Sequence, residues 1–134
     1  MAHGKELVYV DSSQILAGKL DKVKVLIQEL AEFVEANEPS VVAYEIYVEE
    51  SGESMSVFQI HEDSASLERH MEIGMPLFLK FQDSINLERI DVYGEPSPTL
   101  RAVLKAKAES LGNGGVVIHS LVSGFSRWQT NSPH

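Results

Sequence analysis

The chain has 134 residues, of which 43% are hydrophobic, and a formal net charge of −9. This length and composition suit one domain with its own core. The acidic balance disfavours nucleic acid as a partner, because its phosphates attract clustered Lys and Arg, and the absence of cysteine excludes disulfides, thiolate metal sites and cysteine nucleophiles.

Nothing in the sequence predicts a membrane segment or an export signal. No apolar run approaches the roughly 20 residues that cross a bilayer. The first ten residues, MAHGKELVYV, lack the charged start and long apolar centre of a signal peptide. We therefore expect a cytoplasmic protein without a membrane partner.

Strands and helices are predicted to alternate along the chain. Short runs rich in β-branched and aromatic residues predict strands at 7–11, 41–48, 55–61, 85–94 and 116–125. Apolar residues at helical spacing predict a helix over 19–36, a helix from 64 that ends at Gly74, a short piece opened by Pro76, and a helix over 98–111. The polar end, 129–134, is expected to fray.

The order of these elements is βαβ, then βαβ, then an appended αβ. The handedness rule for crossover connections favours a ferredoxin-like βαββαβ arrangement. We therefore predict an α+β fold with an antiparallel sheet and helices on one face. Residues 1–94 would form the ferredoxin-like unit, and 95–134 would be a helix-strand extension of the same domain.

Apolar residues occupy both faces of the predicted strands. A half-solvated antiparallel sheet would show polar residues at every second position, so the face without helices needs a cover. A second copy of the chain, packed sheet to sheet as a homodimer, is the simplest cover. The alternative is that the third helix and fifth strand fold back over this face. In the strand over 41–48, one face carries Val42, Tyr44, Ile46 and Val48 and the other carries Val41, Ala43 and Tyr47. In the strand over 55–61, one face carries Met55 and Val57 and the other carries Phe58 and Ile60.

Two segments resemble the antibiotic biosynthesis monooxygenase domain. These are EFVEANEPSVVAYEIYVEES (32–51) and FQIHEDSASLERHMEIGMPLFLKF (58–81), and the resemblance extends from Glu6 to about Gly94. It implies a dimeric α+β barrel with a pocket in each protomer between sheet and helices. It also implies a cofactor-independent monooxygenase that acts on a small aromatic or quinol-like molecule, with His70 at the position of the family's helix histidine.

Other functions stay open beside this one. The pocket tryptophan of characterised members has no counterpart, since Trp128 lies near the C-terminus. A non-catalytic dimer that binds a small ligand, or a stress-related module, is the alternative, and a haem-handling protein is a third possibility.

Three residues are candidates for acid–base chemistry. His70 lies on the apolar stripe of its helix, and an imidazole can accept a phenol's proton near neutral pH. The competing interpretation is a buried histidine bonded to the protein. His61 and Glu45 could form an imidazole–carboxylate pair if strand register brings them together.

Four aromatic residues could line a flat pocket for a small hydrophobic or aromatic ligand, although plain core packing is the competing interpretation. We expect neither a cofactor nor a metal, because no phosphate loop and no matched histidine spacing occurs in the sequence. The aromatic candidates are Tyr44, Phe58, Phe78 and Phe81.

Overall fold

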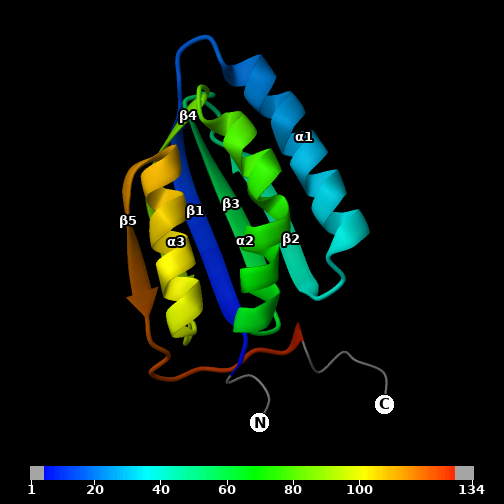
Figure 1. Ribbon diagram of the computed structural model, residues 1–134, viewed down its shortest axis with the longest axis vertical. Coiled ribbons are helices and arrows are strands. Elements are labelled where there is room, and N and C mark those ends of the chain that lie inside the picture. The colour runs from blue at the N-terminus through cyan, green and yellow to red at the C-terminus, as the bar shows by residue number, and fades with distance from the viewer. Residues whose placement is uncertain (1–4, 129–134) are drawn as a thin grey trace.

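Three helices cover one face of a five-stranded sheet (Figure 1). The computed structural model describes residues 5–128. The strands are β1 (Leu7–Ile15), β2 (Val41–Val48), β3 (Ser54–His61), β4 (Ile85–Tyr93) and β5 (Gly112–His119). The helices are α1 (Leu20–Asn37), α2 (Ser64–Phe78) and α3 (Pro98–Leu111), and a 3₁₀ turn, η2 (Leu79–Phe81), follows α2.

The strand order is β2-β3-β1-β4-β5. The first four strands pair antiparallel in the ferredoxin-like order, which confirms the predicted α+β class with an appended helix and strand. The prediction of a wholly antiparallel sheet is wrong for β5, which pairs parallel to β4 of its own chain. The reason is α3, a crossover helix that returns the chain to the end of the sheet where β4 began.

Element boundaries differ from prediction by more than one residue at three places. β1 continues to Ile15, and β5 covers 112–119 instead of 116–125. α2 runs without a break through Gly74 and Pro76 to Phe78. Gly74 and Phe78 are both buried, so tertiary packing outweighs the local preference of these residues to end a helix. The fraying expected of 129–134 lies outside the described residues.

The helix-facing side of β1 is unusual because its centre is polar. Leu7 and Ile15 are apolar, whereas Tyr9, Asp11 and Ser13 between them are polar, and all five are buried. Buried polar groups need partners or ligands. The centre of the sheet is therefore where a site is expected.

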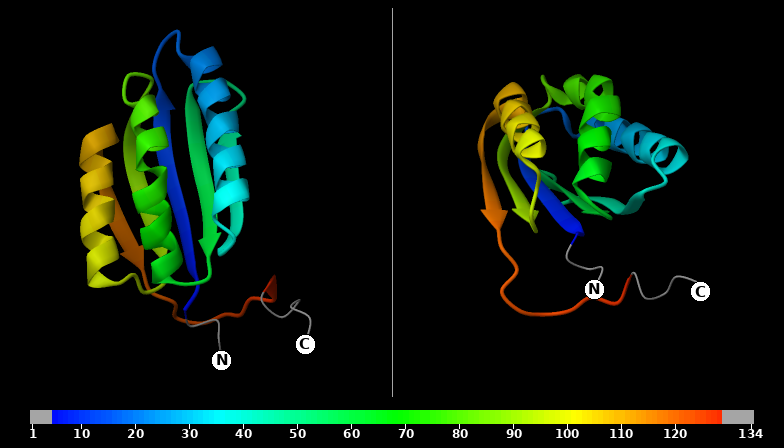
Figure 2. Two further views of the ribbon diagram at one scale, coloured as in Figure 1. Left: turned by 45° about the vertical axis from the view of Figure 1, so that its right-hand side comes forward. Right: turned by 60° about the horizontal axis from the view of Figure 1, so that its bottom comes forward.

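In the described part of the chain, no helix lies on the opposite face of the sheet (Figure 2). α3 packs on the same side as α1 and α2, and β5 extends the sheet at its edge, so neither folds back over the open face. On this face Val10 lies opposite Phe58 and Val8 lies opposite Ile60. Within residues 5–128, no helix is long and apolar enough to cross a membrane.

Candidate functional site

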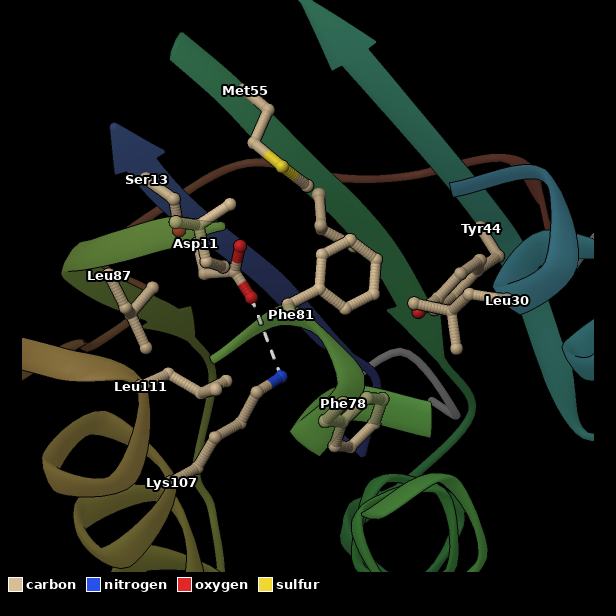
Figure 3. A pocket seen from close by; sticks show the side chains of 12 residues that line it. Asp11, Ser13, Leu30, Tyr44, Met55, Phe78, Phe81, Leu87, Lys107 and Leu111 are labelled. Atoms are coloured by element: carbon tan, nitrogen blue, oxygen red, sulfur yellow. Dashed lines mark hydrogen bonds and ion pairs between the residues drawn. The ribbon is translucent and has the colours of Figure 1, made fainter. Parts of the chain in front are cut away.

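A small cavity lies between the sheet and the helices (Figure 3). Its volume is about 30 Å³, and Asp11, Ser13 and Lys107 supply its charged and polar wall. Space of this size holds about one water molecule. The remaining lining residues are Leu30, Tyr44, Met55, Val57, Phe78, Phe81, Ile85, Leu87 and Leu111.

Lys107 reaches from α3 into a buried chain of hydrogen bonds. Its Nζ donates to the Tyr9 hydroxyl at 2.8 Å, and that hydroxyl donates to Asp11 Oδ2 at 2.6 Å. Lys107 Nζ also lies 3.5 Å from Asp11 Oδ2 and 4.2 Å from the centroid of the Phe78 ring. A buried ammonium paired with both a carboxylate and an aromatic face is a strong, oriented positive charge.

Burial controls the protonation of Lys107 and Tyr9. It lowers the pKa of Lys107 from its ordinary value, while the Asp11 carboxylate acts in the opposite direction. Burial also raises the pKa of Tyr9 well above 10, and the neighbouring Asp11 adds to this shift. Tyr9 therefore stays a neutral hydroxyl, which accepts a hydrogen bond from Lys107 and donates one to Asp11.

Sequence reasoning missed Tyr9, Asp11 and Lys107. A signal was present, since Lys107 continues the inner stripe of α3 defined by Leu100 and Leu104, where an apolar residue is expected. Asp11 likewise occupies an inward position of β1. Charged residues at positions that the periodicity assigns to the core mark this site.

His70 is buried and bonded to a carboxylate. Its Nδ1 lies 2.9 Å from Glu38 Oε1, and both side chains are almost wholly enclosed. A carboxylate can only accept, so Nδ1 carries the proton of a neutral ring and Nε2 carries the lone pair. Nε2 has no hydrogen-bond partner among the described residues. Burial lowers the pKa of His70, and the Glu38 carboxylate partly offsets that effect.

The His70 ring lies one layer behind the cavity wall. Its centroid is 5.1 Å from that of Tyr44 and 5.1 Å from that of Phe78, and both of these residues line the cavity. Phe81, a third predicted ligand contact, lines the cavity as well. The roles of these residues in binding stay predictions.

His61 and Glu45 do not meet. Residues directly opposite in neighbouring strands share a face, and Glu45 lies opposite Phe58, three residues from His61. Glu45 and Phe58 are therefore on the open face of the sheet and His61 on the helix side. The predicted pair does not form, and Phe58 does not line the cavity.

Both nitrogens of His61 are occupied within the protein. Nδ1 lies 2.7 Å from Ser66 Oγ, and Nε2 lies 2.7 Å from Gln59 Oε1. The amide oxygen can only accept, so Nε2 carries the proton and Nδ1 accepts from Ser66. This ring is held neutral, since burial lowers its pKa to about 3.

We expect His61 to make the fold sensitive to acid. The unfolded chain binds a proton at this residue below pH 6.5, whereas the native state does so only near pH 3, so stability falls as pH drops through this window. Between pH 7.5 and 5 the loss is about 2 kcal/mol at about 1.4 kcal/mol per pH unit. Urea unfolding at both pH values should show a correspondingly smaller loss in His61→Gln, and an equal loss would contradict the assignment.

Comparison with solved structures identifies the fold. MupZ from Pseudomonas fluorescens matches with a TM-score of 0.72 at 15% identity, over 92% of this chain and 95% of that one. SnoaB from Streptomyces nogalater, a cofactor-independent oxygenase, matches with a TM-score of 0.59 at 14% identity, over 69% and 95%. A "putative antibiotic biosynthesis monooxygenase" from Bacteroides thetaiotaomicron matches with a TM-score of 0.53 at 19% identity, over 70% and 90%.

The chain therefore has the α+β fold of the antibiotic biosynthesis monooxygenase domain. No family model matches the sequence, and no curated protein matches it. Residues 1–94 are about 70% of the chain, so the 92% shared with MupZ includes much of the segment that follows. The helix that carries Lys107 lies in this segment.

Proposed function

We propose that this protein is a cofactor-independent monooxygenase that acts on a small aromatic, quinol-like molecule bound beside Lys107. The observation that carries the proposal is the hydrogen-bonded chain of Lys107, Tyr9 and Asp11, two of which, Lys107 and Asp11, form the charged wall of a cavity lined mainly by apolar and aromatic side chains. The likeness to SnoaB, a cofactor-independent oxygenase, supports this class of reaction.

The lysine would favour the ionised form of a phenol. An ammonium within hydrogen-bond reach lowers the pKa of a hydroxyl group, and burial strengthens that effect. His70 is the candidate proton acceptor, because its Nε2 carries a lone pair without a partner among the described residues and its ring contacts the cavity wall. Glu38 would hold this ring in the accepting tautomer.

The reaction needs no further electron source. The phenolate transfers one electron to O₂, and the superoxide and substrate radical combine into a carbon-bound peroxide anion. This anion takes back the proton that His70 accepted from the phenol and becomes a hydroperoxide. Loss of water from the peroxide leaves a quinone with one oxygen atom from O₂, while the other atom leaves in the water. Lys107 would stabilise the negative charge that passes from the phenolate to the oxygen.

The test is oxygen uptake with a panel of naphthols and reduced naphthoquinones, and transfer of one labelled atom from ¹⁸O₂ to the product of a naphthol. In His70→Asn an amide N–H can still donate to Glu38, but the accepting nitrogen is lost. We expect this variant to remain folded and to lose most of the uptake. Unchanged uptake would remove His70 from the reaction.

A non-catalytic module for the same ligand class is the second candidate. The small volume of the cavity favours it, since a site that opens only far enough to admit a ligand ring leaves no room for O₂ beside that ring. Retention of a naphthol in native mass spectrometry, without uptake by any compound of the panel, would decide for this candidate.

We also propose that the open face of the sheet pairs with a second copy of the chain. On this face the neighbouring strands β3 and β1 carry apolar Val10, Phe58 and Ile60, and the strands on either side, β2 and β4, carry charged Glu45, Arg89 and Asp91. An apolar centre with a charged rim is the usual anatomy of a protein interface. A two-fold axis would place these residues against their own copies.

Phe58→Asp is expected to convert the dimer into a folded monomer. Because both protomers carry the substitution, it places two charges in the centre of the interface, and each costs about 2 kcal/mol or more of association free energy. Sedimentation at micromolar concentration measures the change. Val25→Asp is the control, because Val25 is 67% exposed on α1, in the helix layer. A wild-type protein that sediments as a monomer would overturn the proposal.

A further inference from the structure

Phe78 contacts the two groups to which the proposed function assigns chemistry. Lys107 Nζ lies 4.2 Å from the centroid of its ring, and the His70 ring meets it edge to face at 5.1 Å. An aromatic ring thus already occupies a place next to a buried ammonium and next to the imidazole whose Nε2 has no partner in the described part of the chain.

The cavity itself is too small for an aromatic ligand. Its volume is about 30 Å³, whereas an apolar cavity that binds benzene measures about 150 Å³. A side chain of the wall must therefore move before a ring can enter. The Phe78 side chain is itself a six-membered aromatic ring in this wall, and Figure 3 shows it beside Lys107.

The last turns of α2, which carry Phe78, have fewer backbone hydrogen-bond donors than a regular helix. Pro76 lies inside the helix and has no N–H to donate, so one backbone hydrogen bond of the last turns is missing. A Cβ atom on Gly74 would lie 2.7 Å from Cζ of Phe78, so the ring rests in a groove that exists because residue 74 has no side chain. The 3₁₀ turn η2 follows directly.

We propose that the ring position of Phe78 is the ligand's ring site, and that Phe78 swings out when a hydroxy-aromatic molecule enters. The ligand ring then packs against the Lys107 ammonium, and its hydroxyl group donates to Nε2 of His70, which Glu38 keeps in the accepting tautomer. The inference rests on the proposed function for its ligand class, and it does not require turnover.

Phe78→Ala opens this site permanently, and phenol and toluene are matched probes because a hydroxyl group in one replaces the methyl group in the other. A plain apolar cavity prefers toluene, the less water-soluble probe. The proposed site reverses the order, because only phenol can donate to His70. We expect Phe78→Ala to bind phenol at least tenfold more tightly than toluene in calorimetric titration.

Two variants separate the site from an ordinary void. Phe81→Ala also enlarges the cavity, but no ring contact joins Phe81 to His70 or Lys107 among residues 5–128, so this variant should prefer toluene. Phe78→Ala combined with His70→Leu should lose the preference for phenol. Phe78→Leu, which leaves a smaller void, serves the same comparison if circular dichroism shows that Phe78→Ala is unfolded.

Movement of Phe78 is tested in the wild-type chain. Titration with 1-naphthol should shift the NMR signals of the Phe78 ring, whose assignment comes from the spectrum of Phe78→Leu. A preference of Phe78→Ala for toluene, or binding of naphthol without any change at Phe78, would overturn the inference. Preference for phenol in a protein that never consumes oxygen would leave the inference standing and refute the proposed function alone.

Discussion

Lys107→Met is expected to reduce oxygen uptake by about 100-fold or more, the usual effect of removing a group that stabilises charge in a transition state. Methionine keeps the length and apolar body of the side chain but removes the ammonium that meets Tyr9 and Asp11. Oxygen uptake at saturating naphthol measures the effect. Lys105→Met is the matched control, because Lys105 lies on the exposed side of the same helix.

The same substitution leaves Asp11 buried without its cation. Loss of one partner from a buried ion pair costs about 3 to 5 kcal/mol, so a fall in activity could reflect partial unfolding. The double variant Lys107→Met with Asp11→Asn removes both charges and should regain most of the stability in urea unfolding, yet none of the activity. Recovery of uptake in this double variant would show that Lys107 acts through stability alone.

Glu38→Ala is expected to lower the free energy of unfolding by about 3 kcal/mol, because it leaves the buried Nδ1–H of His70 without an acceptor. Glu38→Gln retains an acceptor oxygen and should restore most of this loss. Urea unfolding of the two variants measures the difference. Glu35→Gln is the control, because Glu35 is an exposed position in the last turn of α1, which ends one residue before Glu38.

Glu38→Gln also separates the effect of the Glu38 charge on His70 from the effect of the Glu38 hydrogen bond. The Glu38 carboxylate raises the pKa of His70 against the larger effect of burial, so a neutral amide should lower this pKa further. A base must be unprotonated to act, and the acidic limb of the kcat/KM profile should therefore move to lower pH, with a lower plateau from a weaker base. An unchanged limb would show that His70 does not set it.

The sequence determined the elements and their order. Periodicity placed α1 and β2 closely, and the crossover rule led to the ferredoxin-like arrangement. These features depend on local conformational preference and on the spacing of apolar residues, both of which can be read from one chain.

The tertiary structure decided which polar residues meet. Lys107 and Tyr9 are 98 positions apart, and Glu38 and His70 are 32 apart. Register placed Glu45 and His61 on opposite faces, although their alternation allowed a pair. A shift of one residue in strand pairing reverses the face of every side chain in a strand. The pattern of residue types within these strands did not distinguish one register from the other. The site forms where segments that are distant in the sequence pack together, so it could be identified only from the tertiary structure.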